Sequence, residues 1–125
     1  MRDGVAATQI AAGWCFPNAV MQYAVPDLEG LSIDMTAMTA KRDRLLAALE
    51  GSGYDVLRPE GTFYLFGRCP CDEAAFIDAL ADRDVFVMPG SLMNADDYFR
   101  ISLTASDEMV ARALPAFADV AGRIR

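Results

Sequence analysis

Arg100 is the residue of this sequence whose type and setting point most directly to chemistry. It lies in residues 99–103, a run whose other members are mainly apolar or aromatic. An arginine on such a strand needs an anion for its five N–H donors, and its planar guanidinium binds a carboxylate through two parallel hydrogen bonds. An arginine in this setting suits the recognition of a carboxylate. The alternative is an edge-strand arginine that points into solvent or pairs with a nearby acidic side chain, namely Asp96, Asp97 or Glu108.

Lys41 is the only lysine, and a lysine nucleophile must be neutral, which requires a desolvated or cation-rich pocket. Lys41 stands beside Arg42 on the charged side of a predicted helix, so we expect a solvated surface lysine. The sequence contains no histidine. This excludes Ser-His-Asp, Cys-His and histidine-metal mechanisms built from this chain alone.

Two short motifs have both a chemical and a purely structural interpretation. Cys69-Pro70-Cys71 resembles half of a metal site, but its spacing is too short and no second Cys or His pair completes four ligands, so we expect no metal site. Pro89-Gly90-Ser91 could offer backbone donors to a ligand or simply form a turn. The aromatic side chains of Phe63, Tyr64 and Phe66 could likewise line a pocket or belong to the core.

The composition indicates one folded globular domain. The 125 residues are 54% hydrophobic and 23% charged, with a net charge of -7. Because nucleic acids and anionic membranes bind clustered positive charge, neither is an expected partner. There is no apolar run of about 18 residues and no leader pattern. The three cysteines, Cys15, Cys69 and Cys71, are an odd number, which fits a reducing compartment better than a disulfide scaffold. We therefore expect a cytoplasmic protein without a membrane span.

Helices dominate the predicted N-terminal half. Residues 5–23 are apolar, and Gly13 and Pro17 predict two short helices with a break at residues 14–17. Residues 26–32 indicate a connector. Asp34 is then a suitable N-cap for an amphipathic helix that ends at about Glu50.

Strands and two further helices are predicted for the rest. Residues 54–57 and 62–66 indicate a β-hairpin, and the second strand is apolar on both faces, which predicts that both are covered. Further strands are predicted at 85–88 and 98–103, with a helix from Asp72 or Glu73 to about Asp82. Ser106 caps a final helix whose predicted core residues are Met109, Ala113, Phe117 and Val120. The order predicts an α+β fold with a small, mostly antiparallel sheet packed against helices.

Three motifs occur in a defined order: GTFYL at residues 61–65, VFVMPGS at 85–91 and FRISLTAS at 99–106. Together they resemble the C-terminal part of class I/II aminotransferases, which are pyridoxal-phosphate enzymes of the aspartate-aminotransferase fold type. The KRDRL segment at 41–45, Gly53-Tyr54 and the stretch 13–22 add to the resemblance, which covers nearly the whole chain.

The resemblance implies that residues 34–125 are the small domain that folds over the cofactor site of a larger domain. Residues 1–33 would be a helical segment that joins this missing large domain. Arg100 matches the family arginine that grips the substrate α-carboxylate. In the family the lysine that holds pyridoxal 5'-phosphate lies in the large domain, and Lys41 is not in that lysine's context. The resemblance therefore assigns no catalytic, cofactor-binding or metal residue to this chain.

As a whole enzyme, the implied protein is a cytoplasmic homodimer that transfers an amino group between an amino acid and a 2-oxoacid. This chain would contribute the carboxylate clamp and would not be catalytic alone. One alternative is a free-standing, non-catalytic binding or interaction domain derived from the same fold, associating through its apolar N-terminal helices. Another is an amino-acid or oxoacid binder that uses Arg100.

Overall fold

The chain divides into two compact units, Met1–Ile33 and Asp34–Arg125. The computed structural model describes residues 1–14, 18–61 and 63–124. The structure does not describe residues 15–17 and 62. Most of the predicted break at 14–17 and the first residue of the predicted strand 62–66 therefore lie outside the described residues.

The first unit contains two helices, α1 (Arg2–Ala11) and α2 (Ala19–Leu28), as the glycine and proline in this region predict. The side chain of Asn18 caps α2 by accepting hydrogen bonds from the backbone N–H groups of Val20 and Met21. Pro26 lies inside α2, so the prediction that a connector begins there is wrong. A proline in the last turn removes one hydrogen bond without ending the helix. Neither helix contains a buried residue.

The second unit contains a four-stranded sheet in the order β1-β2-β4-β3, formed by Val56–Leu57, Tyr64–Arg68, Tyr98–Ser102 and Met88–Pro89, respectively. Every neighbouring pair is antiparallel. The predicted α+β class with a small, mostly antiparallel sheet is confirmed. A four-residue 3-10 helix, η1 (Gly90–Met93), follows β3 directly.

Two strands are shorter than predicted because helix ends use their first backbone groups. The N–H of Tyr54 donates to the carbonyl of Leu49, and the N–H of Val85 donates to the carbonyl of Leu80, at 3.0 and 3.1 Å. These bonds complete the ends of the preceding helices. In the sheet, these two strands therefore comprise only residues 56–57 and 88–89.

Three helices complete this unit: α3 (Met35–Gly51), α4 (Glu73–Ala81) and α5 (Asp107–Ile124). The predicted caps are confirmed, since Asp34, Asp72 and Ser106 accept hydrogen bonds of 2.9, 3.0 and 3.1 Å from backbone N–H groups in the first turn of each helix. Pro115 lies inside α5 without ending it. No helix in the described parts of the chain has the length and apolar content needed to cross a membrane.

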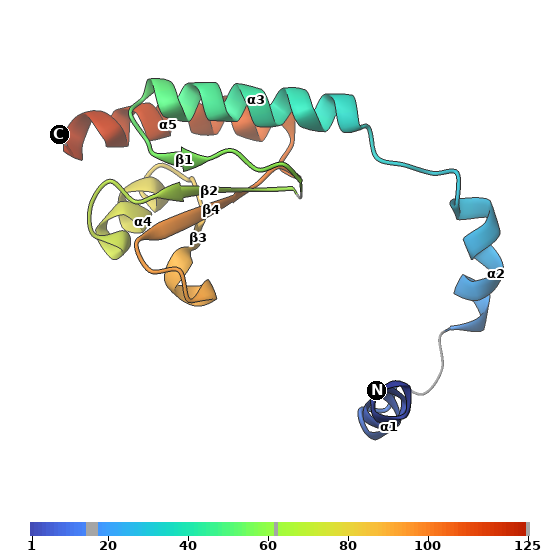
Figure 1. Cartoon of the computed structure of the whole chain (residues 1–125). Helices are drawn as coiled ribbons and strands as arrows, with labels where there is room; N and C mark the ends of the chain where they lie inside the picture. The colour runs from blue at the N-terminus through green and yellow to red at the C-terminus, as the bar shows by residue number, and fades with distance from the viewer. Residues whose placement is uncertain (15–17, 62, 125) are drawn as a thin grey trace. The chain divides into compact units, whose positions relative to one another are not determined.

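The core lies between the helices and one face of the sheet. Figure 1 shows α3 and α5 side by side above the strands. Its fully buried side chains include Leu46, Leu49, Leu65, Phe76, Leu80 and Phe99. Met109, a predicted core residue, is 53% exposed, and its neighbour Val110 is buried instead. The prediction that both faces of the second strand are covered is also wrong, because Tyr64 and Phe66 on the outer face are only half-buried.

Candidate functional site

Arg100 lies at the centre of β4 on the face of the sheet away from the core. Successive side chains of a strand point to opposite faces, so Phe99 and Ile101 pack into the core whereas Arg100 and Ser102 face outward. Arg100 is half-buried. The apolar neighbours in the sequence therefore belong to the other face of the same strand.

The neighbouring strands supply the immediate surroundings of Arg100. Phe66 of β2 and Met88 of β3 are paired with Arg100 on either side of β4. The guanidinium carbon lies 4.0 Å from the centre of the Tyr64 ring, a cation–π contact, and Nη1 donates a hydrogen bond of 3.2 Å to the sulfur of Met93. These contacts hold the guanidinium on the outer face of the sheet.

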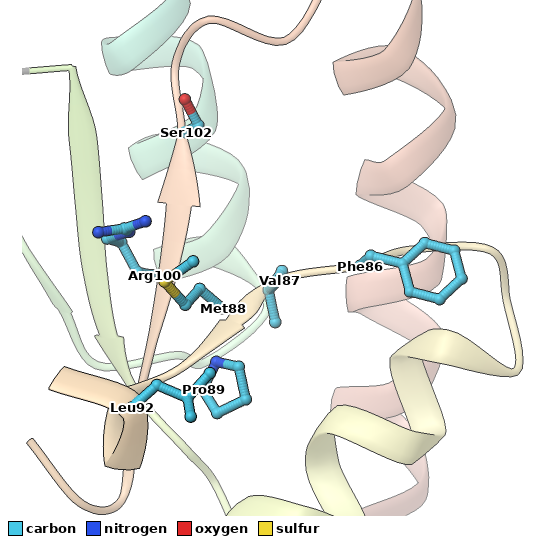
Figure 2. Close-up of a pocket in the computed structure, with 7 residues that line it drawn as sticks. All are labelled: Phe86, Val87, Met88, Pro89, Leu92, Arg100 and Ser102. Atoms are coloured by element: carbon cyan, nitrogen blue, oxygen red, sulfur yellow. The ribbon is translucent and has the colours of Figure 1, made fainter.

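A hollow of about 360 Å³ opens beside Arg100 between β4, β3 and η1 (Figure 2). Figure 2 shows the guanidinium extending away from Phe86, a residue that is 82% exposed. Arg100 is the one charged residue of the lining; the others are Phe86, Val87, Met88, Pro89, Leu92 and Ser102. The hollow therefore combines apolar walls with one cation.

Arg100 has no carboxylate partner within residues 1–14, 18–61 and 63–124. The ion pairs of the described chain include neither Arg100 nor the three acidic residues considered for it, Asp96, Asp97 and Glu108. The acceptor that it does contact, the thioether of Met93, is weak. The guanidinium is therefore equipped to bind a carboxylate from outside this part of the chain.

The turn that follows β3 is held by Glu73 rather than open to a ligand. Both carboxylate oxygens of Glu73, in the first turn of α4, accept from the N–H of Ser91 at 3.3 Å, and one also accepts from the Ser91 hydroxyl. The N–H of Asp97 donates to the same carboxylate at 3.0 Å. Sequence reasoning missed this role because an acidic residue at a helix start is already explained by the helix dipole.

Lys41 is not the solvated lysine predicted from the sequence. Its side chain is only 16% exposed, its Nζ donates a 2.6 Å hydrogen bond to the carbonyl of Ala105, and Asp107 lies 3.8 Å away. The lysine thus joins α3 to the start of α5. The amine is therefore already engaged within this chain and does not face the hollow beside Arg100.

Neither described cysteine is poised as a ligand or nucleophile. Both thiols are free, and burial raises the pKa of Cys69 to about 11 and also raises the pKa of Cys71. A thiol that keeps its proton is a poor nucleophile and a poor metal ligand. Among the described residues no three His, Cys, Asp or Glu side chains gather in a group that could hold a metal ion.

Solved structures of aminotransferases share this fold. An aminotransferase from Eubacterium rectale superimposes with a TM-score of 0.86 and 25% identity, over 95% of this chain and 30% of that one. The aspartate aminotransferase of Thermotoga maritima gives 0.70 and 29%, over 82% and 28% of the two chains. An aspartate aminotransferase of Thermus thermophilus with maleate gives 0.65 and 33%, over 68% and 23%. The fold is that of the aspartate aminotransferase type.

Residues 6–117 match the family model described as aminotransferase class I and II. The chain belongs to this family, and the resemblance stated from its motifs is confirmed. Curated relatives include the aspartate/prephenate aminotransferase of Thermus thermophilus, 37% identical over 86% of this chain, and the aspartate aminotransferase of Thermococcus kodakarensis, 43% identical over 72%. The matched regions are only 31% and 26% of these relatives. The chain therefore spans less than a third of their length.

The described residues do not fit the pyridoxal 5'-phosphate that the family implies. Lys41 is the only lysine of the sequence, and its ammonium is engaged by Ala105 and Asp107. The hollow beside Arg100 has one cation and no lysine in its lining. The site on this chain is therefore a candidate for anion binding and not for holding the cofactor.

Proposed function

We propose that this chain supplies the small-domain part of a pyridoxal-phosphate-dependent aminotransferase and that Arg100 binds the α-carboxylate of the amino acid or 2-oxoacid substrate. The observation that carries the proposal is half-buried Arg100, which has no carboxylate partner among the described residues and lines a hollow with apolar walls. A fixed guanidinium orients a carboxylate through two hydrogen bonds.

The other parts of the proposal concern the whole enzyme. Residues 34–125 act as the small domain, and residues 1–33 join it to a large domain outside this sequence. The lysine that carries pyridoxal 5'-phosphate belongs to that large domain, so this chain is not catalytic alone. The whole enzyme works as a homodimer in the cytoplasm, without nucleic acid or membrane partners. Family membership and the small share of each relative's length support this proposal.

The carboxylate clamp is tested with maleate, the ligand named for the Thermus thermophilus structure. We expect Arg100→Ala to weaken maleate binding at least about tenfold, because a charge-assisted bidentate contact contributes more than ~1.4 kcal/mol. Titration calorimetry or NMR measures the dissociation constant.

Arg68→Ala is the matched control, since Arg68 is an exposed arginine at the end of β2 on the same outer face of the sheet. We expect it to leave maleate affinity unchanged and both variants to melt as the parent does. Equal loss of affinity in the two variants would mean that general positive charge, not Arg100, attracts maleate. Loss of stability in Arg100→Ala with unchanged affinity would assign the arginine a structural role.

The absence of activity in the isolated chain is tested separately. The chain is mixed with pyridoxal 5'-phosphate, aspartate and 2-oxoglutarate, and glutamate formation is followed. We expect no formation above the rate given by the free cofactor, because Lys41 is engaged by Ala105 and Asp107. Enzyme-dependent glutamate formation that is lost in Lys41→Ala would contradict the proposal that the cofactor lysine lies outside this chain.

A further inference from the structure

The turn between β3 and β4 lies against Arg100, and part of it is exposed. Leu92, in η1, lines the hollow and is 73% exposed, while Met93 supplies the sulfur that accepts from Arg100. Asn94 and Asp97 have φ values of 55° and 65°, in the left-handed region that asparagine and aspartate adopt more readily than other residues with a side chain. Backbone hydrogen bonds from Asn94 to Ser91 and from Ala95 to Gly90 close the turn, and contacts from another element are needed to fix its position against the sheet.

Glu73 provides these contacts from the first turn of α4. Its carboxylate accepts from the N–H and hydroxyl of Ser91 at one end of the turn and from the N–H of Asp97 at the other. One half-buried side chain therefore fixes both ends of the segment that carries Met93. Gly90, at the start of the same turn, lies very close to the backbone at its end: a Cβ at this position would be 2.6 Å from the carbonyl oxygen of Tyr98. The turn can therefore close this tightly only with glycine there.

We propose that Glu73 is a positioning residue for Arg100: it holds the turn 91–97 so that Met93 and the Tyr64 ring together keep the guanidinium in one position beside the hollow. The consequence for ligand binding rests on the function proposed above for Arg100. The chain of contacts runs from the Glu73 carboxylate to Ser91 and Asp97, along the turn to Met93, and across 3.2 Å to the guanidinium. Glu73 itself does not line the hollow.

The variant Glu73→Gln tests the proposal in the full chain. The amide keeps the size of the side chain but replaces one acceptor oxygen with an N–H donor that faces the donors of Ser91 and Asp97. We expect the NMR signals of the Arg100 side chain, which the Tyr64 ring shields, and of the Met93 methyl to move toward exposed values. The ring-induced shift of the Arg100 Cδ protons should fall to about half or less, while signals of Leu49 and Phe76 in the core remain in place.

Glu108→Gln is the matched control. Glu108 also lies in the first turn of a helix, α5, and within the described parts of the chain it has no recorded hydrogen bond or ion pair. Both variants lose one negative charge from a helix N-terminus, so only the contact with the turn differs. We expect Glu108→Gln to leave the Arg100 and Met93 signals unchanged.

Maleate titrations of the same proteins separate this inference from the proposed function. We expect the dissociation constant to rise about three- to tenfold in Glu73→Gln, because maleate binding must then also order the long side chain of Arg100. If the parent chain does not bind maleate, the proposed clamp fails, but the Arg100 and Met93 signals still decide the role of Glu73. Unchanged signals in a folded Glu73→Gln would overturn the inference.

If Glu73→Gln does not fold, Ser91→Ala decides. It removes the hydroxyl donor and leaves the two backbone donors to Glu73, so a smaller displacement of the same Arg100 and Met93 signals is expected. Signals that coincide with those of the parent would show that the contact between Glu73 and Ser91 does not position the guanidinium.

Discussion

Hydrogen bonds from single side chains to distant carbonyls join the elements of the second unit. Tyr54 is an example, because its hydroxyl donates a 2.9 Å hydrogen bond to the carbonyl of Phe117, 63 positions later in the chain. Its ring also packs against Phe76, Phe99 and Phe117, with ring centres 5.8 to 6.0 Å apart. Burial, with smaller contributions from Cys71 and Cys69, raises the pKa of Tyr54 from 10.0 to about 12.

Tyr54→Phe should destabilise the protein at neutral pH by about 0.5–1.5 kcal/mol, because the buried hydrogen bond from the Tyr54 hydroxyl to the Phe117 carbonyl is lost. In the parent, the unfolded chain gives up the tyrosine proton near pH 10 whereas the folded chain keeps it to about pH 12. The stability from this group is complete below pH 10 and is lost as the pH rises toward 12. Urea unfolding under reducing conditions at pH 8 and pH 11 measures both effects.

The variant should lose less stability between these pH values than the parent. Tyr23→Phe is the control. Tyr23 is 85% exposed, so this substitution removes one phenol hydroxyl without removing a buried contact. It should match the parent at both pH values. A fall in stability that is as steep in Tyr54→Phe as in the parent would mean that other groups, such as Cys69, cause it.

Residue chemistry could be predicted from the sequence only where it depends on the residue's own element. Arg100 on a strand and the caps Asp34 and Ser106 follow from local patterns, and the caps are confirmed. The partners of Arg100, Tyr64 and Met93, come from a neighbouring strand and a turn, so the sheet register decides them. Lys41 was misjudged for the same reason, because its acceptor on Ala105 is 64 positions away.

Elements could be predicted better than their lengths and buried faces. Helix ends compete with strands for Tyr54 and Val85, which shortens β1 and β3. Met109 and Val110 are adjacent apolar residues of α5, and only the packing of the helix on the sheet selects Val110 for the core. The half-burial of Tyr64 and Phe66 on the outer face of β2 likewise depends on where the helices lie, which a local pattern of apolar residues does not define.

Glycine is required at position 67 of β2 because the Phe99 ring and Val56 lie close to its backbone. A Cβ at this position would lie 2.7 Å from Cε1 of Phe99 and 3.0 Å from Cγ1 of Val56. We expect Gly67→Ala to lower the free energy of unfolding by about 1–3 kcal/mol, since the buried Phe99 ring must move. Chemical denaturation measures the change.

Gly122→Ala is the same chemical change as Gly67→Ala, but we expect it to raise the free energy of unfolding. Gly122 lies inside α5, and a Cβ there would have no atom within 4 Å. Alanine in a helix interior should raise stability by about 0.5–1 kcal/mol. Equal effects from the two substitutions would mean that space around Gly67 is not limiting.

At the scale of the whole molecule, the two units differ in how much they bury. The helices of Met1–Ile33 contain no buried residue, although large apolar side chains such as Met21 and Tyr23 occur there. The second unit contains the entire set of buried core residues found in the described chain. The stability of each unit is therefore expected to have a separate source.

Hydrogen exchange should reveal this difference. We expect backbone amides of α1 and α2 to exchange at least about a hundredfold faster than those of β2 and β4, because helices without buried side chains open locally at low cost. Mass spectrometry of peptides from each unit measures the rates at two protein concentrations. Equal protection of both units at the lower concentration would contradict the expectation, and protection of α1 and α2 only at the higher one would indicate self-association.

The position of the single lysine allows the unwinding of α3 to be followed directly by proteolysis. A protease that cuts only after lysine has one target bond in this sequence, between Lys41 and Arg42, inside α3. To enter a protease, this segment must unwind and Lys41 must leave the carbonyl of Ala105. The rate at which fragments 1–41 and 42–125 accumulate would therefore report the opening of one helix, without any label or substitution.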